Sequence, residues 1–186
     1  MTSNPEKAAL RKHLLEKRDS MSFEIMGFHN QKILSKLKKM KSFSQAESIG
    51  CYYSIGSEVQ TNDLIKALLS EKKIVSLPQV CDDTMVFRRI EDISKLEKGN
   101  FDIPEPKESC PIQETHDVIL IPSIGLDNNG NRIGYGYGFY DKYLTKNEST
   151  KIALTYSKQI VKSIPNSEHD IKMDWIVTET DVIKIS

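Results

Sequence analysis

The sequence predicts an α/β fold with a mostly parallel sheet. Segments with strand-like apolar patterns alternate along the chain with segments of helical spacing, which is typical of this class. After Asp117, residues 118–121 form a continuous apolar run, as expected for a strand buried on both faces. The chain has 186 residues, of which 38% are hydrophobic, so we expect a single domain over residues 1–186 that folds without a disulfide or a metal.

Local patterns predict the individual elements. Before residue 46, leucines and isoleucines recur at helical spacing, with Pro5 and Ser22 as start signals. The expected helices span residues 5–19, 22–40, 61–70 and 138–146. The expected strands span residues 47–54, 73–77, 84–88, 117–121, 151–156 and 175–178. Pro78 is expected to end the second strand, and the acidic, proline-containing segment 91–117 indicates a long surface connection.

The charge balance excludes one class of partner. The chain carries 26 Lys and Arg residues and 26 Asp and Glu residues, so its formal net charge is zero. This balance argues against a dedicated nucleic-acid-binding protein, which normally has a basic excess. The charge is uneven, because residues 1–46 hold ten basic and four acidic residues, an excess of 10 − 4 = +6. Most of the lysines in this segment are expected to lie on solvated helix faces.

The cysteines and the apolar segments indicate the compartment. Cys51, Cys81 and Cys110 are widely spaced and form no C-x-x-C pair, which argues against a disulfide framework and a structural zinc site. No apolar segment approaches the roughly 20 residues that a membrane-spanning helix needs. Residues 1–7 also lack the apolar core of a signal peptide. We therefore expect a cytoplasmic protein with no membrane or nucleic-acid partner.

Glycines concentrate between residues 125 and 138, where five of the nine glycines of the chain lie. Closely spaced glycines between a strand and a helix expose backbone N–H groups that can bind an anion. Arg132 adds a cation suited to phosphate oxygens, and Asp141 adds a hard oxygen ligand suited to Mg²⁺. The spacing differs from the dinucleotide and P-loop fingerprints. A bent hairpin with its turn at 127–130 is the structural alternative, so the glycines alone leave phosphate binding open.

Residues 121–127 (IPSIGLD) and 130–141 (GNRIGYGYGFYD) resemble the signature of the 5-formyltetrahydrofolate cyclo-ligase family. Further elements that resemble the family follow the same order, at residues 7–11, 53–61, 99–106 and 159–179. A co-linear resemblance over most of the chain is far more specific than any one motif. It implies a three-layer α/β/α, Rossmann-like fold of the NagB/RpiA/CoA transferase-like type.

The resemblance implies ATP-dependent conversion of 5-formyltetrahydrofolate to 5,10-methenyltetrahydrofolate, with release of ADP and phosphate. ATP phosphorylates the formyl oxygen, and N10 then attacks the activated carbon. Such a reaction needs positioning and charge neutralisation, and it needs no Ser, Cys or His nucleophile. The implied cofactor is Mg²⁺ with ATP as co-substrate, and the protein is expected to be a monomer or, alternatively, a homodimer.

The same resemblance implies a set of site residues, in which Lys7 and Arg132 are catalytic. The implied ATP-binding residues are Lys7, Arg11, Arg132, Ile133, Gly134, Tyr135, Gly136, Tyr137, Gly138, Phe139 and Tyr140. The implied substrate-binding residues are Ile55, Glu58, Gln60, Phe101, Pro104, Tyr135 and Phe139. The implied metal ligands are Asp141 and Asp174.

Several of these residues also have a purely structural interpretation. Without the resemblance, Lys7 and Arg11 would be ordinary solvated helix charges. Glu58 could be a charge that favours a helix N-terminus, and Asp174 a turn residue at a strand end. Asp170, which follows His169, is expected to be a polar loop residue.

The sequence departs from the family pattern at Gln60, Tyr135, Tyr137 and Phe139, and these departures concern substrate binding in particular.

Two other functions are alternatives. One alternative is a catalytically silent nucleotide- or folate-binding regulator that would bind its ligands without turnover. The other is a sugar-phosphate isomerase or CoA-transferase-like enzyme, because one fold hosts many activities. That enzyme would not require ATP.

Overall fold

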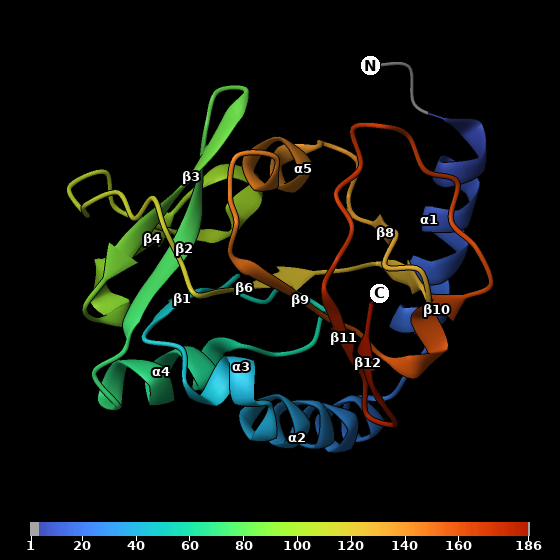
Figure 1. Cartoon of the computed structure of the whole chain (residues 1–186), viewed down its shortest axis with the longest axis horizontal. Helices are drawn as coiled ribbons and strands as arrows, with labels where there is room; N and C mark the ends of the chain where they lie inside the picture. The colour runs from blue at the N-terminus through green and yellow to red at the C-terminus, as the bar shows by residue number, and fades with distance from the viewer. Residues whose placement is uncertain (1–3, 186) are drawn as a thin grey trace.

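A computed structural model describes residues 4–185, apart from the side chain of Phe101. Its main sheet has seven strands in the order β12-β11-β9-β6-β1-β2-β3 (Figure 1). These strands are β1 (Ser48–Gly50), β2 (Ile74–Cys81), β3 (Thr84–Ile90), β6 (Val118–Pro122), β9 (Thr150–Leu154), β11 (Trp175–Val177) and β12 (Val182–Lys184). The inner strands run parallel, and the edge strands β3 and β12 run antiparallel. The predicted α/β fold with a mostly parallel sheet is confirmed.

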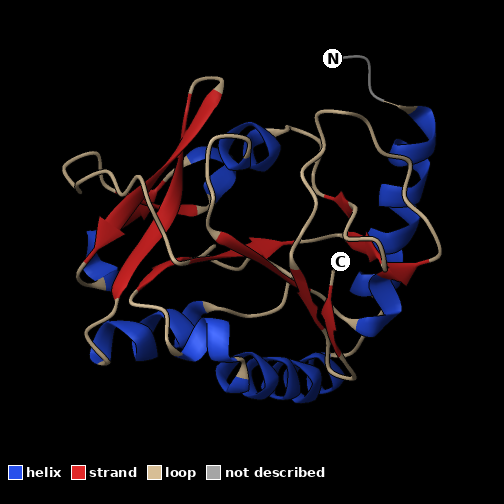
Figure 2. Cartoon of the chain, viewed as in Figure 1, coloured by secondary structure: helices blue, strands red, loops and turns tan. Residues whose placement is uncertain are grey.

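Helices cover the sheet on both faces (Figure 2). They are α2 (Phe23–Lys39), α3 (Lys41–Ser44) and α4 (Asn62–Ser70) on one face and α5 (Phe139–Leu144) on the other. Strand β6 has apolar side chains on both of its faces. Leu120 packs in the core beneath α2 and α4, whereas Ile119 and Ile121 pack in the core beneath α5. All three side chains are fully buried, and each square ångström of such area contributes about 25 cal/mol. The expected three-layer arrangement is therefore also confirmed.

Helix α1 (Pro5–Asp19) packs on a separate small sheet. The Asn4 side chain caps this helix by accepting a hydrogen bond from the Glu6 N–H, and Pro5 occupies its first turn. The small sheet contains β7 (Gly125–Asp127), β8 (Arg132–Ile133) and β10 (Ile160–Val161). A Cβ atom on Gly125 would lie 2.3 Å from Leu14 Cδ1, so glycine lets the helix lie directly on the strand.

Two predicted strands differ from the structure by four residues at one end, and the other four by at most two residues at either end. The strand predicted at 47–54 ends at Gly50, and the following residues form a loop. The strand predicted at 73–77 continues past Pro78 to Cys81, so the prediction that Pro78 ends it is wrong. Strand β1 pairs with β2 only as far as Ser76. Beyond that point only β3 pairs with β2, so a proline without an N–H donor is tolerated.

The segment 91–117 contains more regular structure than expected. It holds a two-stranded sheet of β4 (Leu96–Lys98) and β5 (Pro104–Pro106) and two short 3₁₀ helices, Ile93–Lys95 and Asn100–Asp102. A third 3₁₀ helix spans Ser157–Gln159. The helices predicted at 5–19, 22–40, 61–70 and 138–146 correspond to α1, α2, α4 and α5 with end shifts of two residues at most. None of the helices in residues 4–185 is long and apolar enough to cross a membrane.

Candidate active site

A cavity of about 870 Å³ opens where the C-terminal ends of strands β1 and β6 meet the glycine-rich segment. The chain leaves β1 toward β2 on one side and later returns to β6 on the other, so the order of strands reverses here. Such reversal points are the usual ligand sites of open α/β sheets. The first part of the cavity wall comes from Asn4 and helix α1 (Lys7 and Arg11) and from the loop after β1 (Tyr52, Tyr53, Ile55 and Glu58). The remainder comes from β2 and β3 and from residues 103–105, 132–142 and 167–171.

The glycine loop, residues 134–138, connects β8 to α5 and lines the cavity throughout. Gly136 and Gly138 have φ angles of 102° and 73°, which side chains rarely adopt. The Arg11 Nε donates a hydrogen bond of 2.7 Å to the Gly134 carbonyl oxygen. A Cβ atom on Gly136 would lie 3.2 Å from the Arg11 guanidinium, so the loop backbone and this cation are in close contact.

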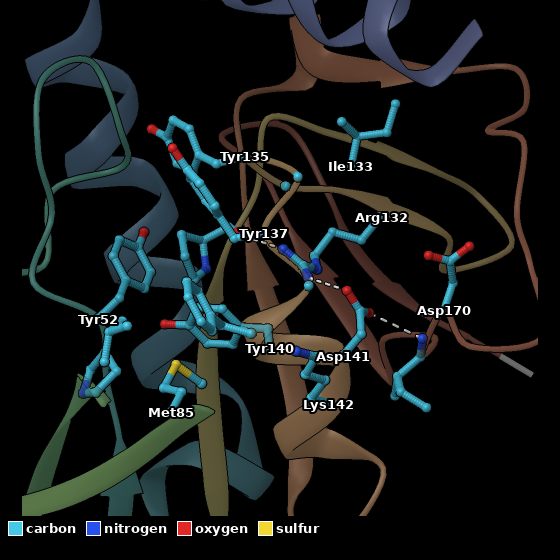
Figure 3. A pocket seen from close by; sticks show the side chains of 18 of the residues that line it. Tyr52, Met85, Arg132, Ile133, Tyr135, Tyr137, Tyr140, Asp141, Lys142 and Asp170 are labelled. Atoms are coloured by element: carbon cyan, nitrogen blue, oxygen red, sulfur yellow. Dashed lines mark hydrogen bonds and ion pairs between the residues drawn. The ribbon is translucent and has the colours of Figure 1, made fainter. Parts of the chain in front are cut away.

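Arg132 and Asp141 form an ion pair at the centre of the cavity (Figure 3). Arg132 Nη2 lies 3.3 Å from Asp141 Oδ2, and Arg132 Nη1 donates to the Pro122 carbonyl oxygen at 3.2 Å. The Ile171 N–H donates to Asp141 Oδ1 at 3.2 Å. Arg132 Nε is buried without a hydrogen-bond partner among the described residues. The guanidinium thus keeps an unused donor, which suits it to a further anionic acceptor.

A second ion pair joins α1 to the segment 167–171. Lys7 Nζ lies 2.6 Å from Asp170 Oδ2, although 163 positions separate the two residues in sequence. Burial alone would raise the pKa of Asp170, but hydrogen bonds from Lys7 and Ser167 hold it below its usual range. Lys7 and Arg11, four residues apart on α1, therefore both reach the cavity and are not ordinary solvated charges. We call Lys7, Arg11, Arg132, Asp141 and Asp170 the ionic end of the cavity.

The opposite wall contains a buried carboxyl group. Glu58 is only 5% exposed, and it accepts hydrogen bonds from the Tyr135 hydroxyl and the Ile55 N–H, both at 2.9 Å. Arg18 Nη2 donates to the Tyr135 hydroxyl oxygen at 3.2 Å. Burial raises the pKa of Glu58, and the Ile55 and Tyr135 hydrogen bonds and the Arg18 charge oppose that rise. We call Ile55, Glu58, Tyr135 and Arg18 the carboxyl end.

Aromatic rings lie between the two ends. The Tyr137 and Phe139 rings stack with centroids 5.9 Å apart and an angle of 21° between their planes. Tyr137 is 55% exposed, so the pair presents ring surface to the cavity. Tyr140 lies beneath them, with the Arg132 guanidinium 5.5 Å from its ring centroid. Flat aromatic or heteroaromatic ligands stack on surfaces of this kind.

The structure brings most of the predicted site residues together, with three exceptions. Gln60 points away from the cavity, and its side-chain amide donates to the Glu58 and Gly56 carbonyl oxygens. Asp174 lies outside the cavity, where its Oδ2 accepts hydrogen bonds from the Lys151 N–H and Nζ at 2.7 and 3.2 Å. The side chain of Phe101 lies outside the described part of the chain. Pro104 and Ile55 do line the cavity.

Sequence reasoning missed Asp170 and Arg18. Asp170 was expected to be a polar loop residue, yet it pairs with Lys7 at the cavity wall. Arg18 was given no individual role from the sequence, yet it is only 3% exposed and bonded to Tyr135. Its position four residues after Leu14, on the buried face of α1, was the one available signal.

Asp141 is the carboxylate best placed to hold a metal ion with a bound nucleotide. Its side chain is 25% exposed at the cavity, so an oxygen can be reached from the ligand side. Within residues 4–185 there is no cluster of three or more His, Cys, Asp or Glu residues that could hold a metal by itself. This arrangement fits Mg²⁺, which is commonly held by one or two carboxylates together with substrate phosphates and water. Asp174 is not among the residues that line the cavity.

Comparison with known proteins shows the family of the chain. The model of the 5-formyltetrahydrofolate cyclo-ligase family matches residues 3–179. The chain is 30% identical over 195 residues to 5-formyltetrahydrofolate cyclo-ligase of Mus musculus, covering 96% of both chains. It is 32% identical over 139 residues to the enzyme of that name from Haemophilus influenzae, covering 69% of this chain and 74% of the other.

Solved structures are similar as well. The solution structure of 5,10-methenyltetrahydrofolate synthetase from Aquifex aeolicus superimposes with a TM-score of 0.88 at 31% identity, covering 96% of this chain and 92% of that one. A 5,10-methenyltetrahydrofolate synthetase from Mycoplasma pneumoniae gives a TM-score of 0.76 at 26% identity, covering 93% of this chain and 98% of that one. The similarity therefore extends over most of the chain.

Proposed function

The chain belongs to the 5-formyltetrahydrofolate cyclo-ligase family, and we propose that the cavity described above is its active site. The enzyme converts 5-formyltetrahydrofolate to 5,10-methenyltetrahydrofolate with ATP. One observation carries the assignment of the site: a single cavity holds cations and a glycine loop at one end and a buried carboxyl group at the other. Two chemically different ligands, a polyphosphate and a ring with N–H donors, can therefore lie side by side.

The ionic end binds ATP in this proposal. Lys7, Arg11 and Arg132 line the same cavity as the glycine loop and supply positive charge for the phosphates. The backbone of residues 133–140 wraps the phosphate chain, since glycines let it approach closely. The stacked Tyr137 and Phe139 rings offer a surface for a flat base or a folate ring.

Arg132 is the principal catalytic residue that we propose, with Lys7 in support. The γ-phosphoryl group passes from ATP to the formyl oxygen, so negative charge on its oxygens must be neutralised during transfer. Arg132 is fixed by Pro122 and Asp141 and is only 7% exposed, which preorganises its guanidinium. N10 of the folate then attacks the formyl carbon, the bond from carbon to the phosphorylated oxygen breaks, and phosphate leaves.

We propose that Asp141 holds Mg²⁺ together with the ATP phosphates. When bound, the ion neutralises phosphate charge, which lowers the cost of bringing two anionic substrates together. Asp141 already lies beside Arg132 and is oriented by the Ile171 N–H. Asp174 bonds to Lys151 between β9 and β11, and we therefore leave it out of the proposed metal site.

The carboxyl end binds the folate in this proposal. Glu58 accepts hydrogen bonds from N–H groups of the pterin ring, as Ile55 and Tyr135 already donate to it. Pro104 and Phe139 supply apolar wall on the same cavity. Gln60 acts behind Glu58, through its hydrogen bond to the Glu58 carbonyl oxygen. Phe101 remains a candidate substrate-binding residue on the basis of the sequence alone.

One assay tests the function. Purified protein is mixed with 5-formyltetrahydrofolate, ATP and Mg²⁺, and the near-ultraviolet absorbance of the methenyl product is followed together with ADP release. We expect both to appear in equal amounts and to depend on ATP. Binding of both ligands without either product would support the silent regulator instead. Conversion of a sugar phosphate or a CoA ester without ATP would support the isomerase or transferase alternative.

We also propose a cytoplasmic location and a monomeric enzyme, with a homodimer as the alternative. All three cysteines are free, as in proteins of reducing compartments. Every residue assigned to the site comes from one chain, so a single copy suffices to bind both substrates. Analytical ultracentrifugation with and without the two ligands distinguishes the two assemblies.

A further inference from the structure

The Tyr135 hydroxyl links three segments that are far apart in sequence. It donates to Glu58 in the loop that follows β1, and it accepts from Arg18 near the end of α1. Tyr135 itself belongs to the glycine loop. Its hydrogen bonds therefore connect the carboxyl end of the cavity to the loop that we assign to the ATP phosphates. This inference rests on that assignment.

Glu58 is covered in this state of the protein. Only 5% of the residue is exposed, so a ligand reaches its carboxyl group only after a covering group has moved. The two hydrogen-bond partners of the carboxyl group differ in their freedom to leave. The Ile55 N–H belongs to the backbone of the turn that carries Glu58, whereas Tyr135 is a side chain with 42% exposure. Tyr135 is therefore the displaceable partner.

Arg18 can compensate for the departure of Tyr135. Its Nε donates to the Ser57 hydroxyl at 2.8 Å, which fixes the guanidinium beside the Glu58 loop. Its Nη1 is buried and has no hydrogen-bond partner among the described residues. The cation thus stays near Glu58 after the hydroxyl leaves, and it keeps the carboxyl group available to N–H donors.

The glycine loop is held at two points. Arg11 donates to the Gly134 carbonyl oxygen, and Tyr135 bonds to Glu58. Between Tyr135 and α5, Gly136 and Gly138 have left-handed φ angles and no Cβ, so this part of the loop can rotate readily. Release of Tyr135 therefore removes one of these two hydrogen bonds, beside two glycines whose backbone can rotate.

We infer that the Tyr135 hydroxyl is a displaceable occupant of the folate site. A ring that presents N–H donors to Glu58 replaces this hydroxyl, and the released glycine loop then closes on the nucleotide. Folate and nucleotide therefore bind with positive coupling, and Tyr135 transmits it. By linkage, each ligand tightens the binding of the other by the same factor.

The variant Tyr135→Phe tests this inference by calorimetric titration. In the absence of nucleotide, it should bind 5-formyltetrahydrofolate about five-fold more tightly than the wild type, the factor for one ordinary hydrogen bond. In the wild type, saturating folate should tighten binding of a non-hydrolysable ATP analogue with Mg²⁺ several-fold. In the variant this coupling factor should fall towards one, because the loop is already free.

A matched control and the contrary outcomes complete the test. Tyr53→Phe removes a hydroxyl from another part of the cavity wall and should not tighten folate binding. Thermal unfolding of Tyr135→Phe should show a cooperative, folded protein. Equal or weaker folate binding by folded Tyr135→Phe would overturn the inference alone. A wild type that neither binds the folate nor makes the methenyl product would overturn the proposed function, and this inference with it.

Discussion

The two ends of the cavity solve opposite electrostatic problems. At the ionic end, carboxylates and cations are paired within a few ångströms and remain partly exposed, with 25% exposure for the Asp141 side chain. At the carboxyl end, Glu58 is nearly inaccessible, and burial raises its pKa. The first end is suited to a polyanion that replaces the internal carboxylates. The second end favours a neutral ring with N–H donors, since a further anion beside Glu58 would be repelled.

Substitution of Arg132 should have the largest effect on activity, because it removes the central cation of the ionic end. We expect Arg132→Ala to lower kcat/KM by about 10²- to 10³-fold, since an oriented donor to developing charge is lost. Arg132→Lys should lie between this variant and the wild type, because an ammonium keeps the charge but cannot bond like the planar guanidinium. Steady-state kinetics with thermal unfolding as the folding control measure both. Near-normal turnover by Arg132→Ala would show that the ionic end is assigned wrongly.

Substitutions of the two aspartates predicted as metal ligands should have clearly different effects. Asp141→Asn should lower kcat by about 100-fold and raise the Mg²⁺ concentration for half-maximal rate, because a cavity carboxylate is lost. Asp174→Asn is the matched control, since its carboxylate bonds to Lys151 outside the cavity. It should leave the Mg²⁺ dependence unchanged and lower the unfolding free energy by about 1 kcal/mol. Measuring the rate of both variants at varied Mg²⁺ concentration tests this prediction. A changed Mg²⁺ dependence in Asp174→Asn would contradict the proposal that Asp141 and not Asp174 holds the metal ion.

The pH dependence of folate binding tests the carboxyl end. Because burial raises the pKa of Glu58, its ionised form is present above that raised value and is lost as the pH falls through it. We expect the KM for 5-formyltetrahydrofolate to rise several-fold as the pH falls through a window that begins above the ordinary glutamate pKa of about 4.3. The KM for ATP should change less there. Glu58→Gln should show weak folate binding that no longer depends on pH in this window.

The smallest effect that we predict is that of Asp170→Asn, which is compared with substitution of its ion-pair partner Lys7. Lys7→Met should raise the KM for ATP about ten-fold, the factor for loss of one charge-assisted hydrogen bond. Asp170→Asn should change it by less than about two-fold, because the ATP phosphates take over as partners of Lys7. Initial rates at varied ATP concentration compare the two. Equal losses in both variants would mean that the ion pair positions α1 and that Lys7 does not bind phosphate.

Much of the fold could be predicted from local patterns. The apolar run within 117–121 predicted a buried strand, and the helical spacing of 5–19 predicted a helix. Both elements appear within one residue of the expected bounds. The edge strand β12 and the small sheet of β7, β8 and β10 were not predicted. Their strands are two or three residues long, so they have no period of their own, and their pairing depends on segments far away in sequence.

The site was predictable where chemistry and local spacing coincide, and not where long-range contacts decide. Arg132, Asp141 and the glycines lie within ten residues of each other, so their convergence could be foreseen. Asp170 becomes part of the cavity only because the segment 167–171 folds back toward α1. Asp174 shows the converse, because a carboxylate near the right motif bonds to a neighbouring strand instead.

The position of Asn4 has a practical consequence for anyone who makes this protein. Asn4 caps α1 and lines the cavity, so anything attached before it begins beside the cavity opening. At the other terminus, Ile185 packs against Gly130 in the turn between β7 and β8. An affinity tag on the C-terminal side is therefore preferable, whereas an uncleaved acidic N-terminal tag would compete with the anionic substrates for the cations of the ionic end.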